Sequence, residues 1–100
     1  RNSPRFMRPE DLAVLRKLTD DIYQDFTSRL NSRFTNLTDV DIQLCILIKL
    51  GFSISQIAIL TAISPTSVSQ QKSRTKKRIQ QQEPDSFAEG ETLDLWLRKF

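Results

Sequence analysis

One stretch of the sequence decides the fold, residues 53–79, which read SISQIAILTAISPTSVSQQKSRTKKRI. Its first half is apolar and begins with serines that can cap a helix. Its second half begins with Ser64 and Pro65, an N-cap followed by proline at the first helical position, and is then polar and basic. The stretch therefore predicts two short helices separated by three or four residues, with the second over about 65–81. This is a helix-turn-helix pattern.

The two predicted helices differ in their apolar content. The first must bury Ile57, Ala58 and Leu60, and the small Ala58 lets the second helix approach closely. The second has only a narrow apolar line, which consists of Val68, Thr75 and Ile79. A basic helix with few apolar residues, held on an apolar support, is typical of a helix that enters the major groove of DNA.

A long helix is predicted near the start of the chain. Pro9, Glu10 and Asp11 form a helix-start signature. Apolar residues then recur at three- and four-residue spacing and predict one helix of about 20 residues. They are Leu12, Leu15, Leu18, Ile22, Phe26 and Leu30. Such a stripe can pack on the rest of the domain or pair with a second copy as the end of a coiled coil.

Another helix is predicted between Thr38, its N-cap, and Gly51, which ends it. Its dense apolar positions predict burial on most sides. They are Val40, Ile42, Leu44, Cys45, Leu47, Ile48 and Leu50. Residues 83–91 resemble an acidic linker, and 93–100 form a last short apolar helix. In that helix Trp96 either closes the core or makes a dimer contact.

The expected fold is all-α. It is a helix-turn-helix bundle of about four helices, preceded by the long N-terminal helix. One hundred residues are enough for one small domain with one core. Within it we expect the N-terminal helix over 1–35, the helix-turn-helix unit over 36–82, and the acidic linker with the C-terminal helix over 83–100.

The composition argues against an enzyme. The chain has no His, one Cys and two Gly. These counts exclude imidazole acid–base chemistry, an intramolecular disulfide, a Cys-rich zinc site and a glycine-rich phosphate loop. We therefore expect no catalytic activity, no cofactor, no metal and no small-molecule substrate.

Three features bear on location. Cys45 lies between Leu44 and Ile46 and resembles a buried apolar residue, which fits a reducing cytoplasm. No apolar run approaches the ~20 residues of a membrane helix, so we expect no membrane contact in this fragment. Because the chain begins at Arg1 and shows no apolar signal-peptide core, we expect it to be part of a longer protein.

Positive charge is concentrated in one segment. The net charge is +3, yet residues 65–82 contain five basic residues and no acid. They are Lys72, Arg74, Lys76, Lys77 and Arg78. One explanation is a solvated helix face. The other is a phosphate-binding surface, because cations gain free energy by releasing counterions condensed on nucleic acid. In that case four or five cations would contact phosphates.

Several motifs resemble the LuxR-type (GerE-like) helix-turn-helix signature over about residues 37–79. They are Leu37-Thr38, Gly51-Phe52-Ser53, Gln56-Ile57-Ala58, Ile63-Ser64 and Ser67-Val68, followed by Arg78-Ile79. A closer similarity joins residues 41–45, 49–53 and 74–78 to the C-terminal DNA-binding domains of large Bacteroidetes transcriptional regulators, which often carry tetratricopeptide repeats and a coiled-coil segment. The resemblance implies a four-helix DNA-binding unit of the winged-helix-like superfamily, without a wing, that works as a dimer. The family usually has Glu, His and a large aliphatic residue where Gln56, Gln71 and Thr75 stand.

Candidate DNA contacts follow from this resemblance and from the predicted helix. The base-reading candidates are Ser69, Gln70 and Ser73, with Lys72 alongside. Gln70 is the foremost of them, because an amide can pair bidentately with adenine. The phosphate-binding candidates are Thr66, Gln71, Arg74, Lys76 and Lys77, together with Ser53 and Ser55, the two candidates for the N-cap of the first short helix. Plain solvent exposure is the alternative explanation for Ser69, Gln70 and Ser73.

The sequence thus predicts sequence-specific binding of double-stranded DNA, as a homodimer, by the C-terminal output domain of a bacterial transcriptional regulator. Two alternatives remain. One is a promoter-binding domain like region 4 of a sigma factor. The other, from a different class, is a helical oligomerisation or adaptor module in which the basic run is merely solvated.

Overall fold

The computed structural model describes residues 7–100, which form six α-helices and no strand. They are α1 (Pro9–Ile22), α2 (Phe26–Arg33), α3 (Asp39–Lys49), α4 (Ile54–Thr61), α5 (Pro65–Gln82) and α6 (Leu93–Lys99). The fold is therefore all-α, as predicted. The first six residues of the predicted N-terminal unit lie outside the described range. None of the described helices combines the length and apolar character that crossing a membrane requires.

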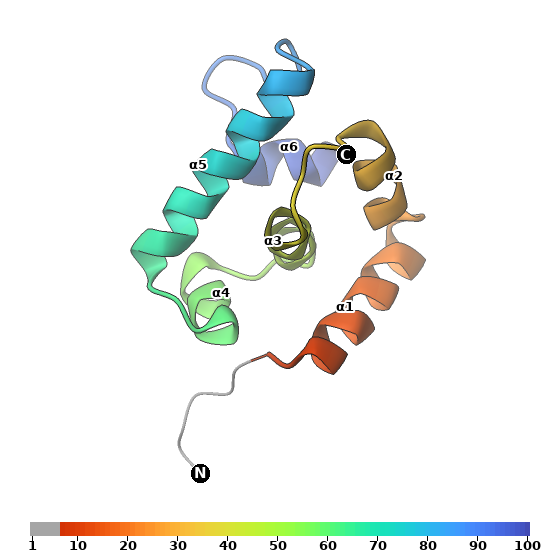
Figure 1. Ribbon diagram of the computed structural model, residues 1–100, viewed down its shortest axis with the longest axis vertical. Helices are drawn as coiled ribbons and strands as arrows, with labels where there is room; N and C mark the ends of the chain where they lie inside the picture. Colours follow the sequence, from red (N-terminus) through yellow and green to blue (C-terminus); the bar gives the residue numbers. More distant parts are fainter. Residues whose placement is uncertain (1–6) are drawn as a thin grey trace.

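The core is built around α3. Figure 1 shows this helix nearly end-on, with α5 on one side and α1 and α2 on the other. Seven of its eleven residues are buried, and it packs against α1, α2, α5 and α6. The prediction of a helix buried on most sides is therefore confirmed. Cys45 lies inside this core, where burial raises the pKa of its thiol far above the usual value.

Local capping sets the helix starts. At four helices the N-cap hydroxyl accepts a hydrogen bond from the backbone amide three residues on: Thr38 for α3 (3.2 Å), Ser53 for α4 (3.1 Å), Ser64 for α5 (3.0 Å) and Thr92 for α6 (3.2 Å). Of the two candidates for the α4 cap, the structure thus uses Ser53 and not Ser55. Pro65 occupies the first position of α5, where its missing N–H costs no helical bond.

The prediction of one continuous N-terminal helix over 9–30 is wrong. Helix α1 ends at Ile22, and α2 begins at Phe26 with a different direction (Figure 1). Between them Gln24 and Asp25 adopt left-handed backbone conformations, with φ of 52° and 58°. Such conformations cannot continue an α-helix and are unfavourable for side chains other than glycine.

A side chain of α1 compensates for this break. The carboxylate of Asp20 accepts hydrogen bonds from the backbone N–H of Thr27 at 2.7 Å and from its hydroxyl at 2.6 Å. Asp20 therefore caps the first turn of α2 from outside that helix. The break lets α2 bury Phe26 and Leu30 completely in the core.

The C-terminal segment completes the core. Trp96 of α6 is almost fully buried, with its ring centroid 5.6 Å from that of Phe34 and 5.1 Å from those of Phe87 and Phe100. Its indole N–H donates to the carbonyl of Ser86 at 3.1 Å. Of the two roles predicted for Trp96, the structure supports closure of the core.

The Asp20 cap yields a stability prediction. Asp20→Ala should lower the free energy of unfolding by about 1–3 kcal/mol, because it leaves the buried Thr27 hydroxyl without its acceptor. Asp21→Ala is the matched control, since Asp21 makes only an exposed ion pair with Lys17 and should cost less than about 0.5 kcal/mol. Urea unfolding of the two variants measures the difference, and equal losses would contradict the capping role.

Candidate nucleic-acid interface

Helices α4 and α5 are joined by a turn of three residues, Ala62 to Ser64. Ala62 has a left-handed backbone with φ of 60°, and its N–H donates to the carbonyl of Ile59 at 3.3 Å. The next amide, of Ile63, donates to the carbonyl of Ala58 at 3.1 Å. These bonds end α4 within one residue and redirect the chain into α5. The predicted pair of helices with a short turn is therefore present.

The inner side of α5 is the predicted apolar line. Val68, Thr75 and Ile79 are completely buried. The opposite side is exposed, and we call it the outer face of α5. It consists of Thr66, Ser69, Gln70, Ser73, Arg74, Lys77 and Gln81. At 100° per residue these side chains spread around the side that points away from α3.

Three of the four base-reading candidates lie on this outer face, namely Ser69, Gln70 and Ser73. Lys72 does not. Its ammonium lies 3.0 Å from both carboxylate oxygens of Asp94 on α6, and its side chain is only 18% exposed. The reason is geometric, because Lys72 follows the buried Val68 by four residues, slightly more than one helical turn.

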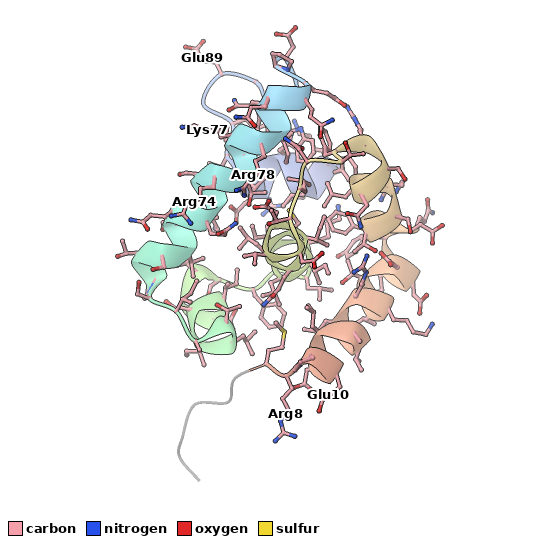
Figure 2. All side chains as sticks on the ribbon, viewed as in Figure 1. Arg8, Glu10, Arg74, Lys77, Arg78 and Glu89 are labelled. Atoms are coloured by element: carbon pink, nitrogen blue, oxygen red, sulfur yellow. The ribbon has the colours of Figure 1, made fainter. Side chains whose placement is uncertain are left out.

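The basic run is divided between the interior and the surface. The Lys76 ammonium donates to the backbone carbonyl of Glu91 and lies 5.0 Å from the Phe87 ring centroid. Within residues 7–100, Arg74 and Lys77 have no ion-pair partner. Figure 2 shows both on the side of α5 that faces away from α3. They are thus the phosphate candidates of the run that the fold leaves available.

A completely buried carboxylate holds α5 to the start of α3. Oδ1 of Asp41 accepts from the Thr75 hydroxyl at 2.6 Å and from the Gln71 amide at 2.8 Å. Arg78 contacts both oxygens, at 3.0 and 2.9 Å. Oδ2 also accepts from the backbone N–H of Thr38 at 2.8 Å and from its hydroxyl at 3.0 Å. We call these five residues the Asp41 network.

The network corrects the prediction for Gln71, whose amide serves Asp41 rather than a phosphate. Sequence reasoning did not single out Asp41, although a signal for it exists. An acid at the third position of α3 completes a capping box with Thr38. Gln71, Thr75 and Arg78 follow one another at spacings of four and three, so they share one side of α5. Gln71 and Thr75 are also two of the positions that depart from the LuxR-type pattern.

The remaining phosphate candidates lie at the starts of α4 and α5. Thr66 and Ser55 are exposed near the starts of α5 and α4. The Ser53 hydroxyl is already engaged as the N-cap of α4, where it accepts a hydrogen bond from the backbone N–H of Gln56. Among the described residues, no group of three or more His, Cys, Asp or Glu side chains is placed to hold a metal ion.

No protein-family model, no curated protein and no solved structure matches this chain. The case for its function therefore rests on its own residues and their geometry.

The Asp41 network makes stability depend on pH. Burial alone raises the pKa of Asp41, but hydrogen bonds from Thr75 and Thr38 and the charge of Arg78 outweigh it and hold that pKa below the ordinary 3.8. A lowered native pKa means that the stabilisation is complete above about pH 4 and is lost as the pH falls through the native pKa.

We therefore expect Asp41→Asn to lower the free energy of unfolding at pH 7 by about 1–3 kcal/mol, because the Asn side chain cannot accept all the hydrogen bonds that Thr75, Gln71 and Arg78 donate to the carboxylate. The variant should also lose less stability than the original chain between pH 4 and pH 2. Urea unfolding across this range measures both effects. Asp39→Asn, an exposed acid in the same first turn, is the control and should change stability by less than about 1 kcal/mol. Parallel acid profiles of Asp41→Asn and the original chain would contradict the assignment.

Proposed function

We propose that this chain binds double-stranded DNA in a sequence-specific manner, with the N-terminal half of α5 in the major groove. We further propose that it is the output domain of a bacterial transcriptional regulator of the LuxR/GerE-like helix-turn-helix type. The observation that carries the proposal is the outer face of α5. This face is polar and cationic, contains no acid and is exposed along the length of the helix. The major groove of B-DNA is wide enough to admit an α-helix such as α5.

The outer face supports a division of contacts. Gln70 presents an amide that can pair bidentately with adenine, whereas Ser69 and Ser73 accept either kind of base and discriminate weakly. Arg74 and Lys77 supply positive charge for the phosphates on either side of the groove. Phosphate contacts position the helix, and the base contacts give it specificity.

The Asp41 network supports this role because it fixes the rotation of α5 about its own axis. Asp41 binds Gln71, Thr75 and Arg78 along two turns on the inner side of the helix. A rotation by one residue, about 100°, would break these bonds and carry Gln70 away from the middle of the outer face. A base-reading side chain needs such a fixed orientation, since hydrogen bonds weaken steeply when they are misaligned.

A helical adaptor or oligomerisation module is the second candidate function. Three of the five basic side chains of α5 are engaged within the chain, namely Lys72, Lys76 and Arg78. This observation favours a partly structural role for the run. A promoter-binding domain like sigma-factor region 4 would use the same outer face and belongs to the same class as the main proposal.

Binding of fluorescently labelled random duplexes at low salt tests the choice between these classes. We expect saturable binding at micromolar concentrations of the chain. Absence of binding at tens of micromolar would contradict DNA binding and favour the adaptor or oligomerisation module. Selection of tight-binding duplexes from a random pool then supplies the specific site for the measurements below.

The division of the basic run predicts the salt dependence. With Arg74 and Lys77 as the phosphate contacts of α5, log K against log salt should have a slope of about −2 per subunit. Lys77→Ala should make the slope about one unit shallower, whereas Lys72→Ala, the control in the ion pair with Asp94, should leave it nearly unchanged. Fluorescence anisotropy titrations at several salt concentrations measure these slopes. A slope near −4 would mean that Lys72 and Lys76 leave their partners in the complex.

Gln70 is predicted to carry base recognition. Gln70→Ala should weaken binding to the selected site by about 1–3 kcal/mol and change binding to random duplexes little, because the amide pairs with a base edge only in the specific complex. Gln81→Ala is a matched control on the same outer face, three turns further along α5, and should change neither affinity. Arg74→Ala should weaken both. Equal losses on both duplexes for Gln70→Ala would show that the recognition side of α5 is assigned wrongly.

A further inference from the structure

Helix α1 carries a row of large apolar side chains that the fold leaves uncovered. Val14, Leu18 and Ile22 are 67%, 44% and 55% exposed. Because they follow one another at four-residue spacing, they lie along one edge of the helix, which we call the α1 row. Tyr23 follows the end of α1, and its ring lies 4.8 Å from the Lys49 ammonium, so it does not belong to the row. Three of the eight exposed large hydrophobic side chains of the described residues therefore belong to this one edge.

The row is separate from the side of α1 that faces the core. Leu12 and Leu15 are partly buried against the core cluster, and Thr19 is completely buried. The core thus covers only two of the five large apolar side chains of this helix. Exposed apolar side chains are ordinary when scattered, but a continuous row on one element marks a contact surface.

Two charged residues border the α1 row. Lys17 and Asp21 each precede a residue of the row by one position, so they stand along its solvent edge. They form an exposed ion pair at 3.3 Å, with side chains 79% and 64% exposed. The border therefore consists of a positive charge and, one turn further along, a negative charge.

We propose that the α1 row packs against the α1 row of a second copy of this chain, with the two helices antiparallel and the two-fold axis at Leu18. The row is self-complementary in this arrangement. Val14 of each copy lies against Ile22 of the other, and the two Leu18 side chains meet at the axis. Isologous contacts of this kind are the commonest way in which soluble proteins form dimers.

The border charges select the antiparallel direction. About the axis at Leu18, Lys17 of one copy and Asp21 of the other differ by only about 3 Å along the helix axis, at 1.5 Å per residue. The pair occurs twice in the dimer. In a parallel arrangement the two-fold axis runs along the helices and carries Lys17 and Asp21 of the two copies to opposite sides of the contact, where no charge of one copy faces a charge of the other from this border. Charge complementarity is therefore present in one direction only.

The arrangement leaves the rest of the molecule accessible. Helix α3 lies between α1 and α5 (Figure 1), so a contact through the α1 row does not cover the outer face of α5. The row spans only about two helical turns, far less than the roughly 800 Å² per partner of a stable interface. The dimer is therefore expected to be weak and to form only at high concentrations of the chain.

Sedimentation equilibrium of the chain between about 10 and 500 µM tests the proposal. The weight-average mass should rise from the 11.6 kDa of a monomer toward twice that value. Leu18→Lys should weaken association at least tenfold, because it buries two like charges at the axis. Leu95→Lys, a similarly exposed leucine on α6, is the matched control and should leave association unchanged. Circular dichroism and thermal unfolding establish that each variant is folded.

Charge exchange tests the direction. Lys17→Asp and Asp21→Lys should each weaken the dimer several-fold, and the double variant that carries both should restore it. In a parallel dimer the single changes would leave the strength of association as it was. A chain that stays monomeric at 500 µM, or association that Leu18→Lys does not alter, would overturn the proposal and assign the row to a different occupant. If neither single charge change alters the dissociation constant of the dimer, the antiparallel arrangement is wrong.

Discussion

The rest of the structure depends on one buried carboxylate. Asp41 stands in the first turn of α3 and binds three residues of α5 that are 30 or more positions away in the chain. Its charge is tolerated in the interior because every oxygen has at least two donors, one of which is cationic. The network fixes the rotation of α5 about its axis. The apolar line alone would specify this rotation poorly, because it contains only three residues.

The same constraint decides which charges reach the surface. A basic run on a helix has cations on all sides, and those on the inner sides must find partners or remain partly desolvated. The C-terminal segment supplies two of these partners, the carboxylate of Asp94 for Lys72 and the backbone carbonyl of Glu91 for Lys76, and Asp41 supplies the partner of Arg78. Lys72, Lys76 and Arg78 therefore hold α5 to its neighbours, and only Arg74 and Lys77 of the basic run remain on the outer face of α5.

The two surfaces that carry the proposals lie on opposite sides of α3. The outer face of α5 is polar and cationic, and the α1 row is apolar with a charged border. Their separation follows from the break after Ile22. A continuous helix would have carried Phe26 and Leu30 on the same stripe as Leu18, whereas the bend directs them into the core and leaves Leu18 outside.

The sequence by itself determined the starts of α3 and α5, limited the start of α4 to Ser53 or Ser55, and indicated the burial of Val68, Thr75 and Ile79 and the exposure of Gln70. These features depend on contacts within about four residues or on helical periodicity, and both can be read from the order of residues. The tertiary structure alone decided the turn between α1 and α2 and the partners of Lys72, Lys76 and Arg78. The turn depends on a carboxylate seven residues before the amide it caps, and the ion pairs join elements 22 and 37 positions apart. Periodicity shows which side of a helix points inward, but only the packing of the whole chain determines which charge lies opposite on the neighbouring element.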